Sequence, residues 1–167
     1  MRIISPWFCP ISSVVAGVPA ARLAQFKRVA IAGASHPAIR AKAAELVEPS
    51  GAATAAAVLA FVQSLPYHAD PSGLGGDWLR PPCRTMVEGG DCDCLATLCG
   101  ALDHAAGLRW RLAWVVNPRA ALDHVAAQVW VAGRWAWQEC TIAGARVGEH
   151  PRDAVARLGG AWKVEGR

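Results

Sequence analysis

Apolar positions in the first third of the chain follow the period of an α-helix. Leu23, Phe26 and Val29 recur every three residues, so their side chains would share one face of an amphipathic helix. Ser35 can cap a second helix that has Pro37 in its first turn, because a serine hydroxyl accepts a hydrogen bond from the amides of a helix start. We expect both helices to be scaffold.

A third helix is predicted over residues 52–65. Pro49 ends the helix before it and Pro66 ends this one, since proline cannot continue a helical hydrogen-bond pattern. Residues 67–88 are then rich in proline and glycine, which predicts a long loop, and long loops inside compact domains are often functional.

The next apolar pattern opens directly on a cysteine. Gly89, Gly90 and Asp91 precede a helical run that starts at Cys92 and ends near Gly107, a residue type that favours the C-terminal end of a helix. The predicted central helix therefore begins almost at the Cys92 thiol.

Three segments rich in tryptophan and valine follow, and they predict strands over residues 109–116, 124–131 and 134–139. Ala132-Gly133 predicts a tight hairpin between the last two. Helices followed by an antiparallel sheet indicate the α+β class. A length of 167 residues suits a single domain, with an N-terminal extension over 1–18, a core of about 20–150 and a C-terminal tail over 151–167.

The composition limits the classes of partner that we expect. Hydrophobic residues make up 53% and charged residues 18% of the chain, which is enough apolar surface for a folded core. The net charge of +4 is spread without a block of like charges, so we expect no nucleic-acid partner. No stretch reaches the roughly 18 apolar residues of a membrane span, and we expect no membrane association.

The cysteines favour a reducing compartment. Three of the six crowd into positions 92–99 of a helical pattern, where neighbours point to different sides and are poorly placed for disulfides. We therefore expect a cytoplasmic protein, with Cys9, Cys83, Cys99 and Cys140 as inert core thiols. Residues 1–20 faintly resemble a signal peptide, but Pro6 and Pro10 interrupt the apolar stretch.

Cys92 is the candidate nucleophile. A helix N-terminus and a nearby imidazole both lower a thiol pKa, and the unpaired amides of a helix start can stabilise an oxyanion. His124 begins a predicted strand and Glu139 ends its hairpin partner. Residues whose numbers sum to about 265 face each other across the predicted turn, and those of His124 and Glu139 sum to 263. Glu139 would thus orient His124 as the base.

These motifs resemble the transglutaminase-like superfamily. Gly-Gly-Asp-Cys-Asp-Cys-Leu-Ala-Thr-Leu at 89–98 is similar to the family's nucleophile motif, and His124-Val125 and the segment from Gly133 to Thr141 are similar to its His strand and its Trp-to-Asp strand. Leu65-Pro66-Tyr67 and Asp70-Pro71 add to the likeness, which spans about 20–150 and extends to small phage- and prophage-encoded members.

The resemblance implies a papain-like core and a triad of Cys92, His124 and Glu139. Two positions depart from the family pattern. The third member is usually Asp, and Cys94 stands where an acidic residue is common. The implied activity is a cysteine protease or amidase, or an acyltransferase, acting on a protein or peptide through an acyl-Cys92 intermediate without a cofactor or metal. A virion or host-envelope target, and virion association, would follow from the phage likeness.

Two alternatives compete with this interpretation. The first is a catalytically idle fold kept as a structural or interaction module, for instance of a phage particle, which the departures at Glu139 and Cys94 favour. The second is a zinc site formed by Cys92, Cys94, Cys99 and His104, for which one continuous helix is a poor geometry. Most of the tryptophans are expected in the core; they are Trp110, Trp114, Trp130, Trp135 and Trp137.

Overall fold

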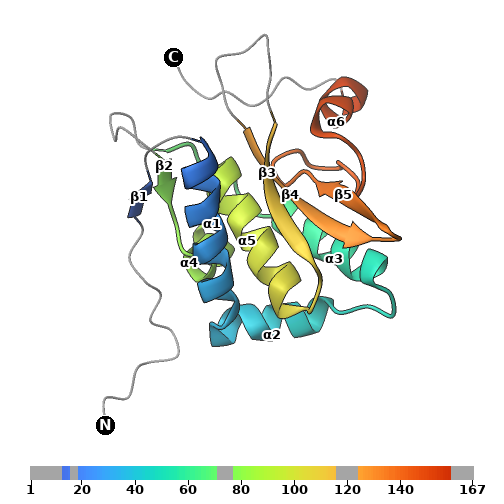
Figure 1. The fold of residues 1–167 in the computed structure, drawn as a ribbon, viewed down its shortest axis with the longest axis horizontal. Helices are drawn as coiled ribbons and strands as arrows, with labels where there is room; N and C mark the ends of the chain where they lie inside the picture. Colours follow the sequence, from blue (N-terminus) through green and yellow to red (C-terminus); the bar gives the residue numbers. More distant parts are fainter. Residues whose placement is uncertain (1–12, 16–18, 71–76, 116–123, 159–167) are drawn as a thin grey trace.

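Figure 1 shows the computed structural model, which describes residues 13–15, 19–70, 77–115 and 124–158. The helices are α1 (Pro19–Ala34), α2 (Pro37–Leu46), α3 (Gly51–Gln63), α4 (Pro82–Glu88), α5 (Cys92–Ala105) and α6 (Pro151–Leu158). The strands are β1 (Ser13–Val15), β2 (Asp77–Leu79), β3 (Trp110–Val115), β4 (His124–Val131) and β5 (Arg134–Gln138). The α+β class is confirmed.

The main sheet is antiparallel in the order β3-β4-β5. Its hairpin turns at Ala132 and Gly133, which have φ angles of 50° and 75°, the positive values that tight hairpin turns require. Val131 pairs with Arg134, and Ala127 pairs with Gln138. These pairs sum to 265, so the predicted register is confirmed. A separate two-stranded sheet joins β1 to β2.

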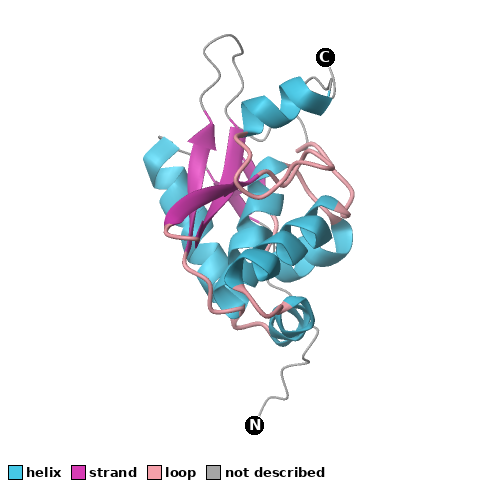
Figure 2. Ribbon diagram, turned by 90° about the vertical axis from the view of Figure 1, so that its right-hand side faces the viewer, coloured by secondary structure: helices cyan, strands magenta, loops and turns pink. Residues whose placement is uncertain are grey.

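Helix α5 is the centre of the core. Every residue from Asp93 to Asp103 is buried, because α1, α2 and α4 contact this helix together with β3 and β4. Figure 1 shows α5 between α1 and the sheet, and Figure 2 shows the sheet lying across the helical part of the molecule. The N-terminal end of α5 is therefore held on several sides at once.

Several expectations about secondary structure are wrong. Residues 67–88 are not one long loop, since they contain β2 and the seven-residue helix α4, which has Pro82 at its first position, where proline is tolerated. The C-terminal tail contains α6. The cap of α2 is His36 rather than Ser35, because the His36 imidazole accepts from the Ala38 amide at 3.2 Å.

The division of the cysteines into free and disulfide-bonded residues differs from the expectation. Cys99 and Cys140 are buried free thiols, as predicted, but Cys83 is disulfide-bonded. Its expected role as a reduced core thiol is therefore wrong, and its partner lies outside the described residues, as does Cys9. A disulfide is unusual in a reducing cytoplasm. In the described part of the chain, no helix is long and apolar enough to cross a membrane.

The tryptophans are less buried than expected. Among the five tryptophans of the sheet strands, Trp110 is 7% exposed, whereas Trp130 is 38% exposed and the other three are half-buried. The expectation that most of them lie in the core is wrong, because one face of the sheet is open toward its hairpin end.

Candidate active site

Cys92 is the first residue of α5 and is only partly exposed. Asp91 is the N-cap, and its carboxylate accepts a hydrogen bond from the Cys94 amide at 3.4 Å. The Cys92 amide has no acceptor within the helix, as is general for the first residues of a helix. The predicted helix start at Cys92 is confirmed, and Asp91 caps it.

The two glycines before Asp91 allow close packing of the backbone. Gly89 has a φ of 76°, and a Cβ there would lie 2.0 Å from the Pro66 carbonyl oxygen. At Gly90, a Cβ would lie 2.5 Å from the Cys94 Cβ. Any larger residue at either position would therefore force the chain apart. The close backbone approach that these glycines allow is to Pro66 and to Cys94.

This tight packing brings a distant segment close to Cys92, the candidate nucleophile. The Gly90 amide donates to the Pro66 carbonyl at 3.2 Å, and the His68 amide donates to the Gly90 carbonyl at 3.1 Å. Tyr67 and Gly90 thus form an isolated parallel β-bridge. The segment after α3 is pinned two residues before Cys92.

His124 and Glu139 form a buried pair. His124 begins β4, Glu139 directly follows β5, and the His124 Nε2 lies 2.6 Å from the Glu139 Oε2. The other carboxylate oxygen, Oε1, accepts from the Thr141 amide at 2.8 Å and from the Thr141 hydroxyl at 2.7 Å. The Glu139 side chain is fully buried, so this contact is shielded from water and its orientation is fixed.

Gln63, the last residue of α3, holds the segment that follows Glu139. Its side-chain amide donates to the carbonyl oxygens of Glu139 at 2.8 Å and Ala145 at 3.0 Å. Its carbonyl accepts from the Gly144 amide at 3.3 Å. One side chain from the scaffold therefore positions the backbone of a candidate catalytic residue.

The sulfur of Cys92 meets the strand that carries His124. The backbone N–H of Val125, the residue after His124, forms a hydrogen bond with the Cys92 sulfur that favours the thiolate. Burial and the charges of Asp91 and Asp93 act more strongly in the other direction, and together they raise the Cys92 pKa well above its usual range. The expectation of a lowered thiol pKa is wrong, because burial of the sulfur, followed by the charges of Asp91 and Asp93, outweighs the effects that lower it.

Tyr67 is a site residue that sequence reasoning did not assign a role. Burial raises the pKa of its hydroxyl, and the charges of Cys92, Asp91 and Asp70 raise it further, so the phenol stays neutral and keeps its proton. The half-buried ring lies beside the start of α5 through the bridge to Gly90. The signal in the sequence was the resemblance that includes Leu65-Pro66-Tyr67, which gave Tyr67 no role of its own.

Cys94 has a structural role in the packing of β2. Its sulfur accepts from the Arg80 amide at 3.2 Å and donates to the Trp78 carbonyl at 3.4 Å. Burial is the main cause that raises the Cys94 pKa, with Asp93 next. This buried thiol is therefore protonated, which answers the question its unusual position in the motif raised.

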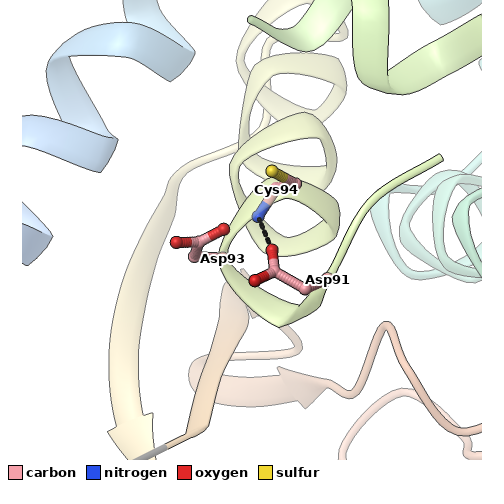
Figure 3. A group of neighbouring side chains, drawn as sticks. All are labelled: Asp91, Asp93 and Cys94. Carbon is pink, nitrogen blue, oxygen red and sulfur yellow. Dashed lines mark hydrogen bonds between the residues drawn. The ribbon is translucent and has the colours of Figure 1, made fainter. Parts of the chain in front are cut away.

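Metal binding finds little support here. Figure 3 shows Asp91, Asp93 and Cys94, whose ligand atoms lie within 4.8 Å of one another. Within the described residues, these three are the group of potential metal ligands that lie close together. Cys94 is the one member that also belongs to the zinc site weighed from the sequence. The Asp91 carboxylate caps α5 and the Cys94 sulfur is hydrogen-bonded to β2 and Arg80, so two of the three already have structural roles.

Comparison of the chain with protein-family models, with curated proteins and with solved structures finds no match in any of the three.

Proposed function

We propose that the protein is a thiol-dependent hydrolase of amide or peptide bonds that works through an acyl-Cys92 intermediate. One observation carries the proposal. Glu139 holds the His124 Nε2 at 2.6 Å, and the amide of the next residue, Val125, reaches the Cys92 sulfur. Nucleophile, base and orienting carboxylate thus come together from three separate elements, which is the arrangement a covalent acyl-transfer site needs.

The raised Cys92 pKa sets the order of the first step. A thiol that is neutral in the free enzyme must lose its proton as it attacks the substrate carbonyl carbon. With Nε2 engaged by Glu139, the His124 Nδ1 is the nitrogen that would accept this proton. The Glu139 carboxylate then stabilises the imidazolium that forms.

Two donors can stabilise the oxyanion of the tetrahedral intermediate. The Cys92 amide at the helix start is one. The Tyr67 hydroxyl is the second, since its raised pKa keeps it a neutral donor beside the nucleophile. Neither group needs a metal ion or a cofactor.

His124 then carries the proton through the two remaining steps, loss of the amine and hydrolysis of the thioester. His124 returns the proton to the departing amine, which leaves as the C–N bond breaks. Water attacks the thioester carbonyl after giving a proton to His124, and the Cys92 sulfur leaves with that proton, releasing a carboxylic acid. An amine in place of water would give acyl transfer, and hydrolysis is the default because no amine-binding segment is evident in the sequence.

One observation favours the alternative, an idle transglutaminase-like fold that serves as a structural or interaction module. Burial and two aspartates disfavour the Cys92 thiolate, and an enzyme that depends on a preformed thiolate would not be built in this way. The two functions differ in whether His124 activates Cys92 toward an acyl donor.

The deciding experiment is acylation by a p-nitrophenyl ester, followed as nitrophenolate release and as acyl mass on the intact protein. Cys92→Ala and His124→Ala should each abolish acylation at this position. Cys99→Ala removes a buried thiol from the same helix and should react like the parent protein, while circular dichroism checks folding. Acylation that is equal in His124→Ala and the parent would favour the idle module.

A further inference from the structure

Cationic and aromatic side chains interleave at the hairpin end of the sheet. The Arg109 guanidinium lies 5.2 Å from the ring centroids of both Trp130 and Trp135. The Arg111 guanidinium lies 4.4 Å from the Trp135 ring. The two rings meet edge to face at 5.4 Å. We call these four residues the Arg–Trp cluster.

The cluster is open and organised. Arg109, Arg111 and Trp130 are exposed, and the Arg111 Nε donates to the side-chain oxygen of Gln128, Oε1, at 2.6 Å. Stacking on a tryptophan face holds a guanidinium in place while its N–H groups point outward in the plane. Two cations are therefore fixed side by side before any partner arrives.

No described carboxylate neutralises them. The ion pairs formed within the described ranges join other residues, and neither Arg109 nor Arg111 takes part in one. An anionic partner would gain charge-assisted hydrogen bonds here without displacing an ion pair of the described residues.

The sheet places this cluster on the face that carries the catalytic pair. Arg111 pairs with Gln128, and Gln128 pairs with Trp137, so these three side chains share one face. Because side chains alternate along a strand, His124 lies on the same face as Gln128, four residues along β4. At about 3.3 Å per residue, the distance along the strand is roughly 13 Å from His124 to Gln128 and roughly 20 Å to Trp130.

The geometry points to an acidic polypeptide as the partner of the Arg–Trp cluster, with acidic side chains four to six residues from the bond that Cys92 cleaves. This inference rests on the proposed function. Carboxylates match the paired N–H groups of a guanidinium. Nucleic acid fits less well, because the bases of a single strand stack on open aromatic faces, and here arginines lie over both tryptophans.

Binding can be tested without catalysis. In the Cys92→Ala protein, the affinity for fluorescein-labelled octaglutamate is measured by anisotropy at one low salt concentration. Arg109→Gln with Arg111→Gln should weaken binding about tenfold or more. The matched control, Arg28→Gln with Arg40→Gln, removes the same charge from exposed positions of α1 and α2 and should change binding less than twofold.

A second variant separates the cluster from net charge. Trp135→Ala removes the ring that carries both guanidinium groups and leaves the charge unchanged, so binding should again weaken several-fold, whereas Trp135→Phe should retain it. Equal losses in the cluster and control variants would overturn the inference. Absence of octaglutamate binding, or tighter binding of an oligothymidylate of equal length or of anionic lipid vesicles, would overturn it as well.

The active protein then links the cluster to the reaction. With a peptide that carries glutamates four to six residues from the cleaved bond, kcat/KM should fall about tenfold in the Arg109→Gln, Arg111→Gln variant, while a short uncharged substrate should be unaffected. If octaglutamate binds as expected and no acyl-Cys92 forms, the acidic-peptide surface stands and the proposed chemistry fails.

Discussion

The Glu139 Oε2 lies 2.6 Å from the His124 Nε2, while its Oε1 accepts both the amide and the hydroxyl of Thr141. The Glu139 carboxylate thus contacts both His124 and Thr141, and the side chain needs its extra methylene, relative to aspartate, to reach both. Glu139→Asp should lose one of the contacts and lower the acylation rate about tenfold or more, with folding retained.

Glu139→Gln tests charge at constant size. A glutamine that accepts from His124 would turn its NH₂ group toward the Thr141 amide, and two donors would then face each other. We expect a loss at least as large as that of the aspartate variant. Thr141→Val removes only the hydroxyl and should cost less, and an unchanged rate in both Glu139 variants would remove this residue from the mechanism.

The pH profile of Cys92 follows from its raised pKa. Alkylation by iodoacetamide should be slow at neutral pH and should keep rising beyond the ordinary thiol pKa of about 8.5. Asp91→Asn keeps a good N-cap and removes one negative charge, so it should shift the profile to lower pH.

Mass spectrometry with fragmentation must assign the alkylated sulfur, because trypsin leaves Cys92, Cys94 and Cys99 on one peptide, residues 85–109. The denatured protein gives the reference profile. A plateau reached well below pH 8.5 in the folded protein would mean that the thiolate is stabilised after all.

Tyr67→Phe isolates one hydroxyl at the site. The ring and its bridge to Gly90 remain, so stability should change little, whereas the acylation rate should fall about tenfold if the phenol donates to the oxyanion. Alkylation of Cys92 by iodoacetamide forms no oxyanion and should be nearly unchanged. Equal losses in the two assays would point to a packing role.

Stability should depend on pH through Asp103. This carboxyl is fully buried on α5, and burial raises its pKa to about 8. The folded state therefore holds a proton that the unfolded chain releases above about pH 4. The stabilisation is complete below that pH and is lost progressively as the pH rises toward 8.

Asp103→Asn should remove this dependence. Asparagine cannot ionise, and its amide offers a donor where the Gln138 Oε1 is buried without a hydrogen-bond partner among the described residues. In urea unfolding, the variant should gain on the order of 5 kcal/mol over the parent at pH 9 and little at pH 4. The same difference at both pH values would contradict the assignment.

The disulfide at Cys83 bears on where the protein resides. Alkylation of unreduced, denatured protein should label Cys92, Cys94, Cys99 and Cys140 but not Cys83, and a non-reducing peptide map should identify the joined peptide. Reduction should cost about 2–4 kcal/mol of stability. Persistence of the bond in protein isolated from cells would argue for an oxidising compartment, and a fully reduced Cys83 would return the balance to the cytoplasm.

Local patterns predicted much of this fold. The apolar period located α1 and α5, and the Ala132-Gly133 turn predicted the register that brings His124 and Glu139 together. These features depend on residues close in sequence, so a single chain reveals them. The prolines of residues 67–88 led to the wrong prediction of a loop, because Pro82 begins a short helix instead of breaking one.

Long-range packing was hidden from the sequence. The burial of Asp93 and the open face around Trp130 depend on which elements cover which side of the sheet. A lowered pKa of Cys92 was predicted from the helix start and the nearby imidazole, whereas burial and the charges of Asp91 and Asp93 raise this pKa. The candidate nucleophile, base and carboxylate are predicted by order and spacing, whereas the contacts of Tyr67, Gln63 and Thr141 needed coordinates.

Gln63 ties the end of α3 to the backbone of Glu139, seventy-six positions further along the chain. None of the α3 side chains is proposed to touch the reacting atoms, yet a substitution that loosens Gln63 would shift the carboxylate that orients His124. In a scan of every position for loss of function, the end of this scaffold helix would therefore score with the residues proposed to be catalytic, although it lies outside the proposed site.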